Sequence, residues 1–87
     1  MFPPDAAGTQ AAVRAYWRGQ YDAHYFATAV VKSVGPCAIT TMERRPVYVC
    51  PAVFEDDQGQ RRRAFVNLAA RLPLGWTVVQ FSPLGSE

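Results

Sequence analysis

The sequence predicts an α+β domain in which one N-terminal helix packs on a twisted antiparallel sheet of four to five strands. Three observations predict this fold. A single segment with helical periodicity comes first, short segments rich in β-branched and aromatic residues follow, and the turns between them are brief. Parallel strands need long crossovers, so the brief turns favour an antiparallel meander. A chain of 87 residues has room for one hydrophobic core.

The helix is expected to begin near Thr9, a favourable N-cap residue, or one turn earlier at Asp5. Spacings of three and four define its apolar stripe, and the helix should end within residues 21–24. Members of the stripe are Val13, Tyr16, Trp17 and Tyr21. The helix is therefore expected to cover a sheet with an aromatic surface.

The strand-like segments occupy the rest of the chain up to Pro83. Residues 24–34 read as a strand, although the same residues are compatible with a continued helix. The next strands are expected in residues 37–42, 47–54, 61–72 and 76–82. Residues 1–8 are then a flexible lead-in, residues 9–83 a single α+β domain, and residues 84–87 a tail. Pro51 cannot donate to a ladder, so it predicts an edge or a bulge.

The stretch "FEDDQGQRRRAF" predicts a charge-matched hairpin. A turn centred on Gln58–Gly59 places Asp56 opposite Arg61 and Glu55 opposite Arg62, and a slip of one residue places Glu55 opposite Arg61. Opposite charges across a ladder contribute roughly 0.2–1 kcal/mol each. Because side chains alternate, the three arginines divide between the two faces, which favours a hairpin role over a nucleic-acid patch.

The same register assigns the two faces of the sheet. The face toward the helix is expected to carry Val47, Val49, Val53, Ala64, Val66, Leu68, Ala70 and Leu72. The opposite face should be polar if it met only water, yet it retains aromatic and apolar side chains. We interpret it as an interface that a homodimer or another protein partner would bury. Its candidate residues are Tyr48, Cys50, Phe54, Arg63, Phe65 and Trp76.

Candidate catalytic and metal-binding residues are few. His24 is the only histidine, and Asp22 points away from it on a helix. A hairpin turning at Glu43–Arg44 places Cys37 opposite Cys50, but these cysteines with His24 match no zinc-ligand spacing. The acids of residues 55–57 diverge along a strand and face arginines, which argues against a cation site. We therefore expect no catalytic residue, no metal and no cofactor.

Composition favours a globular chain and does not by itself imply a polyanion partner. The chain is 49% hydrophobic and 18% charged, with a net charge of +2, too small to imply nucleic acid by itself. There is no run of 18 apolar residues and no secretory signal, so no membrane contact and a cytoplasmic location are expected. Two reduced thiols are the default for such a location, and a Cys37–Cys50 disulfide is the alternative for an exported protein.

The order of one helix and about five strands resembles the cystatin-like and NTF2-like folds. The closing stretch "RRRAFVNLAARLPLGWTVVQFSPL" is similar to the final hairpin of NTF2-like domains. The resemblance to cystatins implies inhibition of papain-like proteases through a Gln-x-Val-x-Gly loop and a Pro-Trp loop. In this chain the stretch "VKSVG" keeps only the glycine of the Gln-x-Val-x-Gly loop, as Gly35. In place of the adjacent Pro-Trp pair, two residues separate Pro73 from Trp76. The inhibitory residues therefore do not carry over.

These observations predict a small non-enzymatic interaction module that associates with itself through the apolar sheet face. A nucleic-acid-binding module is the alternative, because arginines interleave with Tyr48 and Phe65. Its candidate residues are Arg44, Arg45, Arg61 and Arg63. Less favoured alternatives are a protease inhibitor and a small-molecule carrier with a helix–sheet cavity lined by Tyr16, Trp17 and Tyr21.

Overall fold

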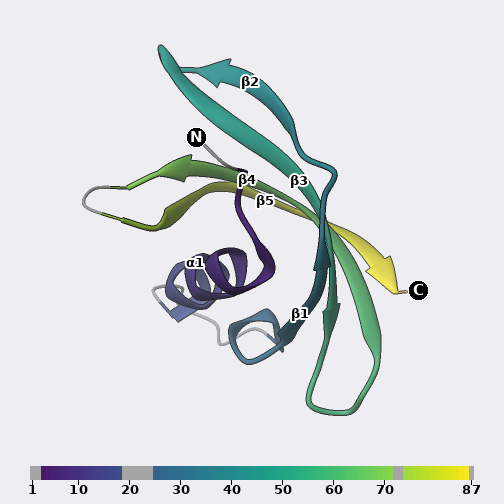
Figure 1. Cartoon of the computed structure of the whole chain (residues 1–87). Coiled ribbons are helices and arrows are strands. Elements are labelled where there is room, and N and C mark those ends of the chain that lie inside the picture. The colour runs from purple at the N-terminus through teal and green to yellow at the C-terminus, as the bar shows by residue number, and fades with distance from the viewer. Residues whose placement is uncertain (1–2, 19–24, 72–73, 87) are drawn as a thin grey trace.

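The fold consists of one helix lying against one side of a strongly curved, five-stranded antiparallel sheet (Figure 1). The computed structural model describes residues 3–18, 25–71 and 74–86. Helix α1 spans Ala6–Arg18, and a short 3₁₀ turn, η1, spans Tyr25–Ala27. The strands are β1 (Val30–Val34), β2 (Ala38–Met42), β3 (Arg45–Glu55), β4 (Arg61–Ala70) and β5 (Trp76–Ser86). The predicted α+β class is confirmed, and the layout fits the one that the resemblance implies.

Helix α1 begins at the earlier of the two predicted positions. The Asp5 side chain accepts a hydrogen bond from the Gly8 backbone N–H at 2.7 Å, which is the contact of an N-cap residue. Thr9, Ala12 and Val13 are buried, and Tyr16 is half-buried on the same side of the helix. The predicted stripe is therefore confirmed as far as Trp17. Its last member, Tyr21, and the predicted helix end lie outside the described residues.

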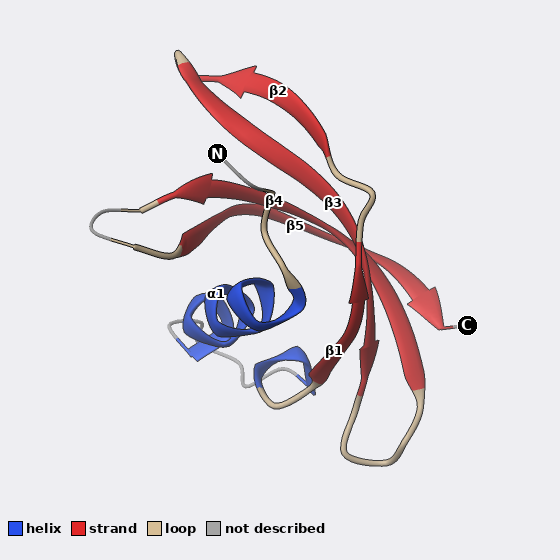
Figure 2. Ribbon diagram, viewed as in Figure 1, coloured by secondary structure: helices blue, strands red, loops and turns tan. Residues whose placement is uncertain are grey.

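Strand β3 is the centre of the sheet and pairs with three other strands. On one edge it pairs with β4, and on the other edge it pairs with β1 and β2, which lie end to end (Figure 2). The change of partner falls at Pro51, whose missing N–H removes a ladder bond, and Gly35 donates to the Pro51 carbonyl at 2.8 Å. The predicted edge position or bulge at Pro51 is wrong, because β3 is the central strand and Pro51 pairs with Phe65 without a shift of register. The meander is wrong in one respect, since β1 pairs with β3 rather than with β2.

The two-residue turn at Glu43–Arg44 joins β2 to β3 in the predicted register. Both residues have a positive φ, 51° and 67°, as a type I′ hairpin turn requires. Cys37 therefore lies opposite Cys50, and the two cysteines form a disulfide. The expectation of two reduced thiols is wrong, because this register brings the two Cα atoms within 4.3 Å of each other.

The β3–β4 hairpin has the alternative register, in which Glu55 lies opposite Arg61. The turn is a loop of residues 56–60 rather than a two-residue turn at Gln58–Gly59, so Asp56 is not opposite Arg61. A shift of one residue turns every β3 side chain to the other face. The helix side of β3 consequently carries Tyr48, Cys50, Ala52 and Phe54, whereas Val49 and Val53 lie on the outer side. The predicted faces of β3 are wrong, and those of Ala64, Val66 and Leu68 are right.

Aromatic rings fill the core between α1 and the sheet. Phe26 from η1 and Phe54 from β3 are fully buried, with ring centroids 4.9 Å apart and nearly perpendicular planes. Phe81 from β5 lies 4.7 Å from Phe26 and 5.3 Å from Trp17. Edge-to-face packing of this kind stabilises a core beyond the area that it buries.

Strand β5 continues to Ser86, so residues 84–86 belong to the sheet rather than to a tail. Pro83 does not end the strand, because β5 is an edge strand whose partner among the described strands is β4 alone. Two residues, Val79 and Leu84, are extra in the β4–β5 ladder and form bulges. The second bulge adds an exposed leucine near the outer side of the sheet.

Candidate functional site

The six residues that the sequence nominates for an interface do not lie on one surface. Tyr48, Cys50 and Phe54 are buried in the core under the helix, with exposed fractions of 8%, 0% and 0%. Trp76 is half-buried on the helix side and packs edge-on against Tyr48, with a centroid distance of 5.5 Å. The assignments of Tyr48, Cys50 and Phe54 are wrong because of the one-residue shift in β3. The assignment of Trp76 is wrong because neither alternating set of β5 is clearly polar, so the sequence does not distinguish its two faces. Arg63 and Phe65 alone lie on the outer face, as predicted.

The outer face nevertheless carries an apolar surface, which we call the outer patch and define by Pro51, Val53, Phe65 and Leu84. Phe65 is 39% exposed and Leu84 is 48% exposed, while Pro51 and Val53 are half-buried. The patch surrounds a shallow hollow of about 230 Å³, and the exposed Arg63 stands at its margin. Sequence reasoning missed Pro51, Val53 and Leu84. A correct β3 register would have found the first two.

The four arginines of the nucleic-acid alternative lie at opposite ends of the sheet. Arg44 and Arg45 are at the β2–β3 turn, whereas Arg61 and Arg63 begin β4, next to the other end of β3. Ten steps of about 3.3 Å along β3 separate these ends by about 33 Å. The aromatic residue Tyr48, moreover, is buried beneath the helix. The arrangement does not gather these groups into one patch that a single strand could track.

The arginine triplet contributes one ion pair to the β3–β4 loop. The carboxylate of Asp56 accepts hydrogen bonds from the backbone N–H groups of Gln58 and Gln60 at 3.0 and 2.8 Å. Its other oxygen accepts from Arg62 Nε at 3.1 Å. The hydrogen bond from the Gln60 backbone, supported by those from Arg62 and Gln58, lowers the pKa of Asp56 below its ordinary value of 3.8. The carboxylate therefore closes the loop in its charged form.

We expect Asp56→Asn to lower the melting temperature at neutral pH, because the charge that these donors stabilise is lost. The folded pKa is lower than the unfolded pKa, so the contribution is complete above the unfolded value and disappears as the pH falls through the folded one. The difference between wild type and variant should therefore shrink on acidification. Thermal denaturation over a pH series measures it, with the exposed neighbour Asp57→Asn as the control. A constant difference at every pH would contradict the role of the charge.

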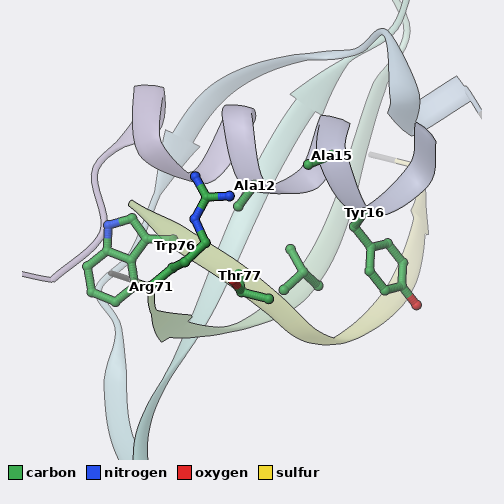
Figure 3. A pocket seen from close by; sticks show the side chains of 7 residues that line it. Ala12, Ala15, Tyr16, Arg71, Trp76 and Thr77 are labelled. Atoms are coloured by element: carbon green, nitrogen blue, oxygen red, sulfur yellow. The ribbon is translucent and has the colours of Figure 1, made fainter. Parts of the chain in front are cut away.

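A trough between α1 and β5 lies on the helix side of the sheet (Figure 3). It has a volume of about 220 Å³, and aromatic rings stand at both ends, with Trp76 at one and Tyr16 at the other. We call it the α1–β5 trough. Its lining residues are Ala12, Ala15, Tyr16, Arg71, Trp76, Thr77 and Val78. It differs from the cavity expected from the sequence, since Trp17 packs into the core and Tyr21 lies outside the described residues.

The residues considered for metal binding do not form a site within the described part of the chain. No group of three or more His, Cys, Asp or Glu side chains that could hold a metal ion occurs there. Cys37 and Cys50 are joined to each other. His24 lies outside the described residues. The three acids of residues 55–57 include Asp56, whose oxygens are occupied by the loop and by Arg62.

Comparisons with known proteins identify no relative for this fold and surface. No protein-family model matches the chain, no curated protein matches it, and no solved structure matches it. The helices in the described ranges are all too short to cross a bilayer. The fold and its surfaces are therefore the basis for any functional assignment.

Proposed function

We propose that this protein is a small interaction module that binds a second copy of itself through the outer patch. The observation that carries the proposal is the exposure of Phe65 and Leu84 around a hollow on the face of the sheet opposite α1. The role is one of binding rather than catalysis. The residues of this surface differ from those expected from the sequence. The argument for an interface is unchanged, because one helix cannot cover both sides of a sheet.

The composition of the outer patch supports burial by a partner. An antiparallel sheet with one solvated face normally alternates apolar and polar residues, so its outer positions are polar. Here Pro51, Val53 and Phe65 occupy adjacent outer positions on two paired strands, and the bulge at Leu84 extends the same apolar area. Single exposed hydrophobic residues are common, but a contiguous group around a hollow is typical of an interaction site.

Three features favour a second copy as the occupant. The patch has both a projecting leucine and a hollow, so a two-fold axis can place Leu84 of each copy in the hollow of the other. Glu55 and Arg63 lie at the same end of the outer face, so the margin of the patch carries both signs of charge, as a surface that pairs with its own copy can use. The molecule measures 38 by 27 Å in its two longest directions, which accommodates the roughly 800 Å² per partner of a standard interface.

The Cys37–Cys50 disulfide bears on where such a module would act. Structural disulfides persist in oxidising compartments and are rare in the cytosol. The cytoplasmic location expected from the sequence stays a prediction, and the disulfide weighs against it. We propose an oxidising compartment instead. Labelling of free thiols in protein taken directly from its native cell tests this proposal, with protected cysteines as the expected result.

Light scattering coupled to size-exclusion chromatography tests self-association. We expect the wild type to elute as a dimer and Phe65→Glu to elute as a monomer, because the new charge would have to be desolvated in the interface. Phe65 is 39% exposed, so the variant should stay folded. Arg44→Glu, at the distant β2–β3 turn, is a control that also introduces an acid and should stay dimeric. A wild type that is monomeric at high concentration would overturn the proposal.

A further inference from the structure

The α1–β5 trough has fixed walls. Trp76 packs against Gly8, where a Cβ atom would come within 3.0 Å of the indole, so the absence of a side chain at Gly8 lets the ring lie against the helix. Tyr48 holds the same indole from the other side. At the far end, Tyr16 packs edge-on against Trp17 at 5.1 Å and stacks on Phe81 at 6.2 Å. Both aromatic ends are therefore held in place by neighbouring rings or by the helix.

The space between these walls exists because the helix presents small residues there. Ala12 and Ala15 face the trough, and Val78 of β5 lines it from the sheet. A long side chain at Ala15 would occupy the volume. The trough, at about 220 Å³, is smaller than the roughly 300–1,000 Å³ of typical ligand sites. It is therefore suited to a molecule with one ring or a short apolar chain.

A cation lies beside this apolar space. Figure 3 shows the Arg71 guanidinium between Trp76 and Ala12, on the helix side of the trough. The Arg71 backbone donates to the Gly75 carbonyl at 3.0 Å, and Nη2 lies 3.2 Å from where a Cβ of Gly75 would be, so both ends of the arginine pack against this turn. In the part of the chain that the structure describes, Arg62 forms an ion pair with Asp56. Arg71 has no carboxylate partner in the same ranges. The Thr77 hydroxyl is a second polar group in the lining.

From this juxtaposition we infer that the α1–β5 trough binds a small monocarboxylate with an aromatic or short apolar body. The planar guanidinium of Arg71 matches a carboxylate with two parallel hydrogen bonds, and the aromatic walls accept the apolar body. The carboxylate gives Arg71 a partner that it lacks within the described ranges, and a neutral molecule of the same shape does not. The trough and the outer patch lie on opposite sides of the sheet, so this binding does not depend on self-association.

Titration of the ¹⁵N-labelled protein with benzoate tests the inference, with benzamide as the neutral probe of the same shape. We expect saturable shifts at the backbone amides of Ala12 and Thr77 and at the Trp76 indole N–H, and binding of benzamide at least about tenfold weaker. Arg71→Gln should weaken benzoate binding by about the same factor, and because Arg71 is exposed and the variant keeps its backbone hydrogen bond to Gly75, the variant should stay folded. Ala15→Leu should abolish binding by filling the trough.

Arg18→Gln is the matched control, because Arg18 is an exposed arginine at the end of α1 that does not line the trough. It should bind benzoate as the wild type does. The inference is overturned if benzoate gives no saturable shifts, if the shifts map to other residues, or if benzamide binds equally well. It is also overturned if Arg71→Gln and Arg18→Gln have equal effects, because the attraction would then be that of net charge alone.

Discussion

Removal of the Cys37–Cys50 disulfide should lower the free energy of unfolding by about 3 kcal/mol. The bond closes a loop with a sequence separation of 13 residues, and cross-linking a loop of this size restricts the unfolded chain by about that amount. A domain of 87 residues has a total stability on the order of 5–10 kcal/mol, so the loss is a large fraction of it. Urea denaturation of the wild type, with and without a reductant, measures the change.

The effect should be strongest in β2, because the five residues of this strand are all exposed and β3 is its one partner among the described strands. Without the cross-link, amide hydrogen exchange in β2 should accelerate more than exchange at the buried β4 residues. The Cys37→Ala/Cys50→Ala double variant should match the reduced wild type and should not respond to reductant. An unchanged urea midpoint on reduction, or free thiols in the untreated protein, would contradict the prediction.

The two hairpins show what the sequence could predict and why. The β2–β3 turn consists of two residues, so its position determines the register, and the pairing of Cys37 with Cys50 follows from it. The β3–β4 connection is longer. Its glycine marked a turn correctly, with a φ of 78°, but not the number of residues in the loop. The length of the loop depends on Asp56, whose carboxylate accepts hydrogen bonds from two backbone N–H groups of the loop. From the sequence, the negative charge of Asp56 suggested a cross-strand arginine as its partner instead.

The alternation of side chains could not correct the register. In "VYVCPAVF" the odd positions carry Val47, Val49 and Val53, and the even positions carry apolar residues as well, so both faces look like a core. A period of two identifies a buried face only where the other face is polar. The helix was easier to predict, because its aromatic stripe recurs at spacings of three and four, and this stripe faces the sheet as far as Trp17.

The candidate sites depend on features that lie beyond pattern analysis. Leu84 joins the outer patch at a β-bulge, and bulges follow from the fit between β4 and β5 rather than from either strand alone. Arg71 was not nominated for any role, because a single arginine carries no motif and the sequence placed it inside a strand. Its position beside Trp76 and the small residues of the helix becomes visible when β5 and α1 are brought together. Two of the six predicted interface residues, Arg63 and Phe65, remain on the outer face.

Phe54→Ala should destabilise the fold by about 3–5 kcal/mol, the usual cost of removing a fully buried phenylalanine. Phe54 is 0% exposed and contacts the rings of Phe26 and Phe81, which cannot collapse into the space without losing their own contacts. The cost is close to the whole stability of a small domain, so the variant should be partly unfolded at physiological temperature. Thermal denaturation followed by circular dichroism measures it.

Phe65→Ala is the matched control, since it removes the same atoms from the neighbouring strand but from the outer face. Phe65 is 39% exposed in the single chain, so we expect a cost of about 1 kcal/mol or less in a dilute, monomeric sample. At concentrations where the outer patch is buried between two copies, the same variant should lose dimer stability instead. The contrast tests the β3 register itself, because a shift of one residue exchanges the two faces of that strand. Small losses for both variants would restore the face assignment predicted from the sequence, in which both phenylalanines lie on the outer face.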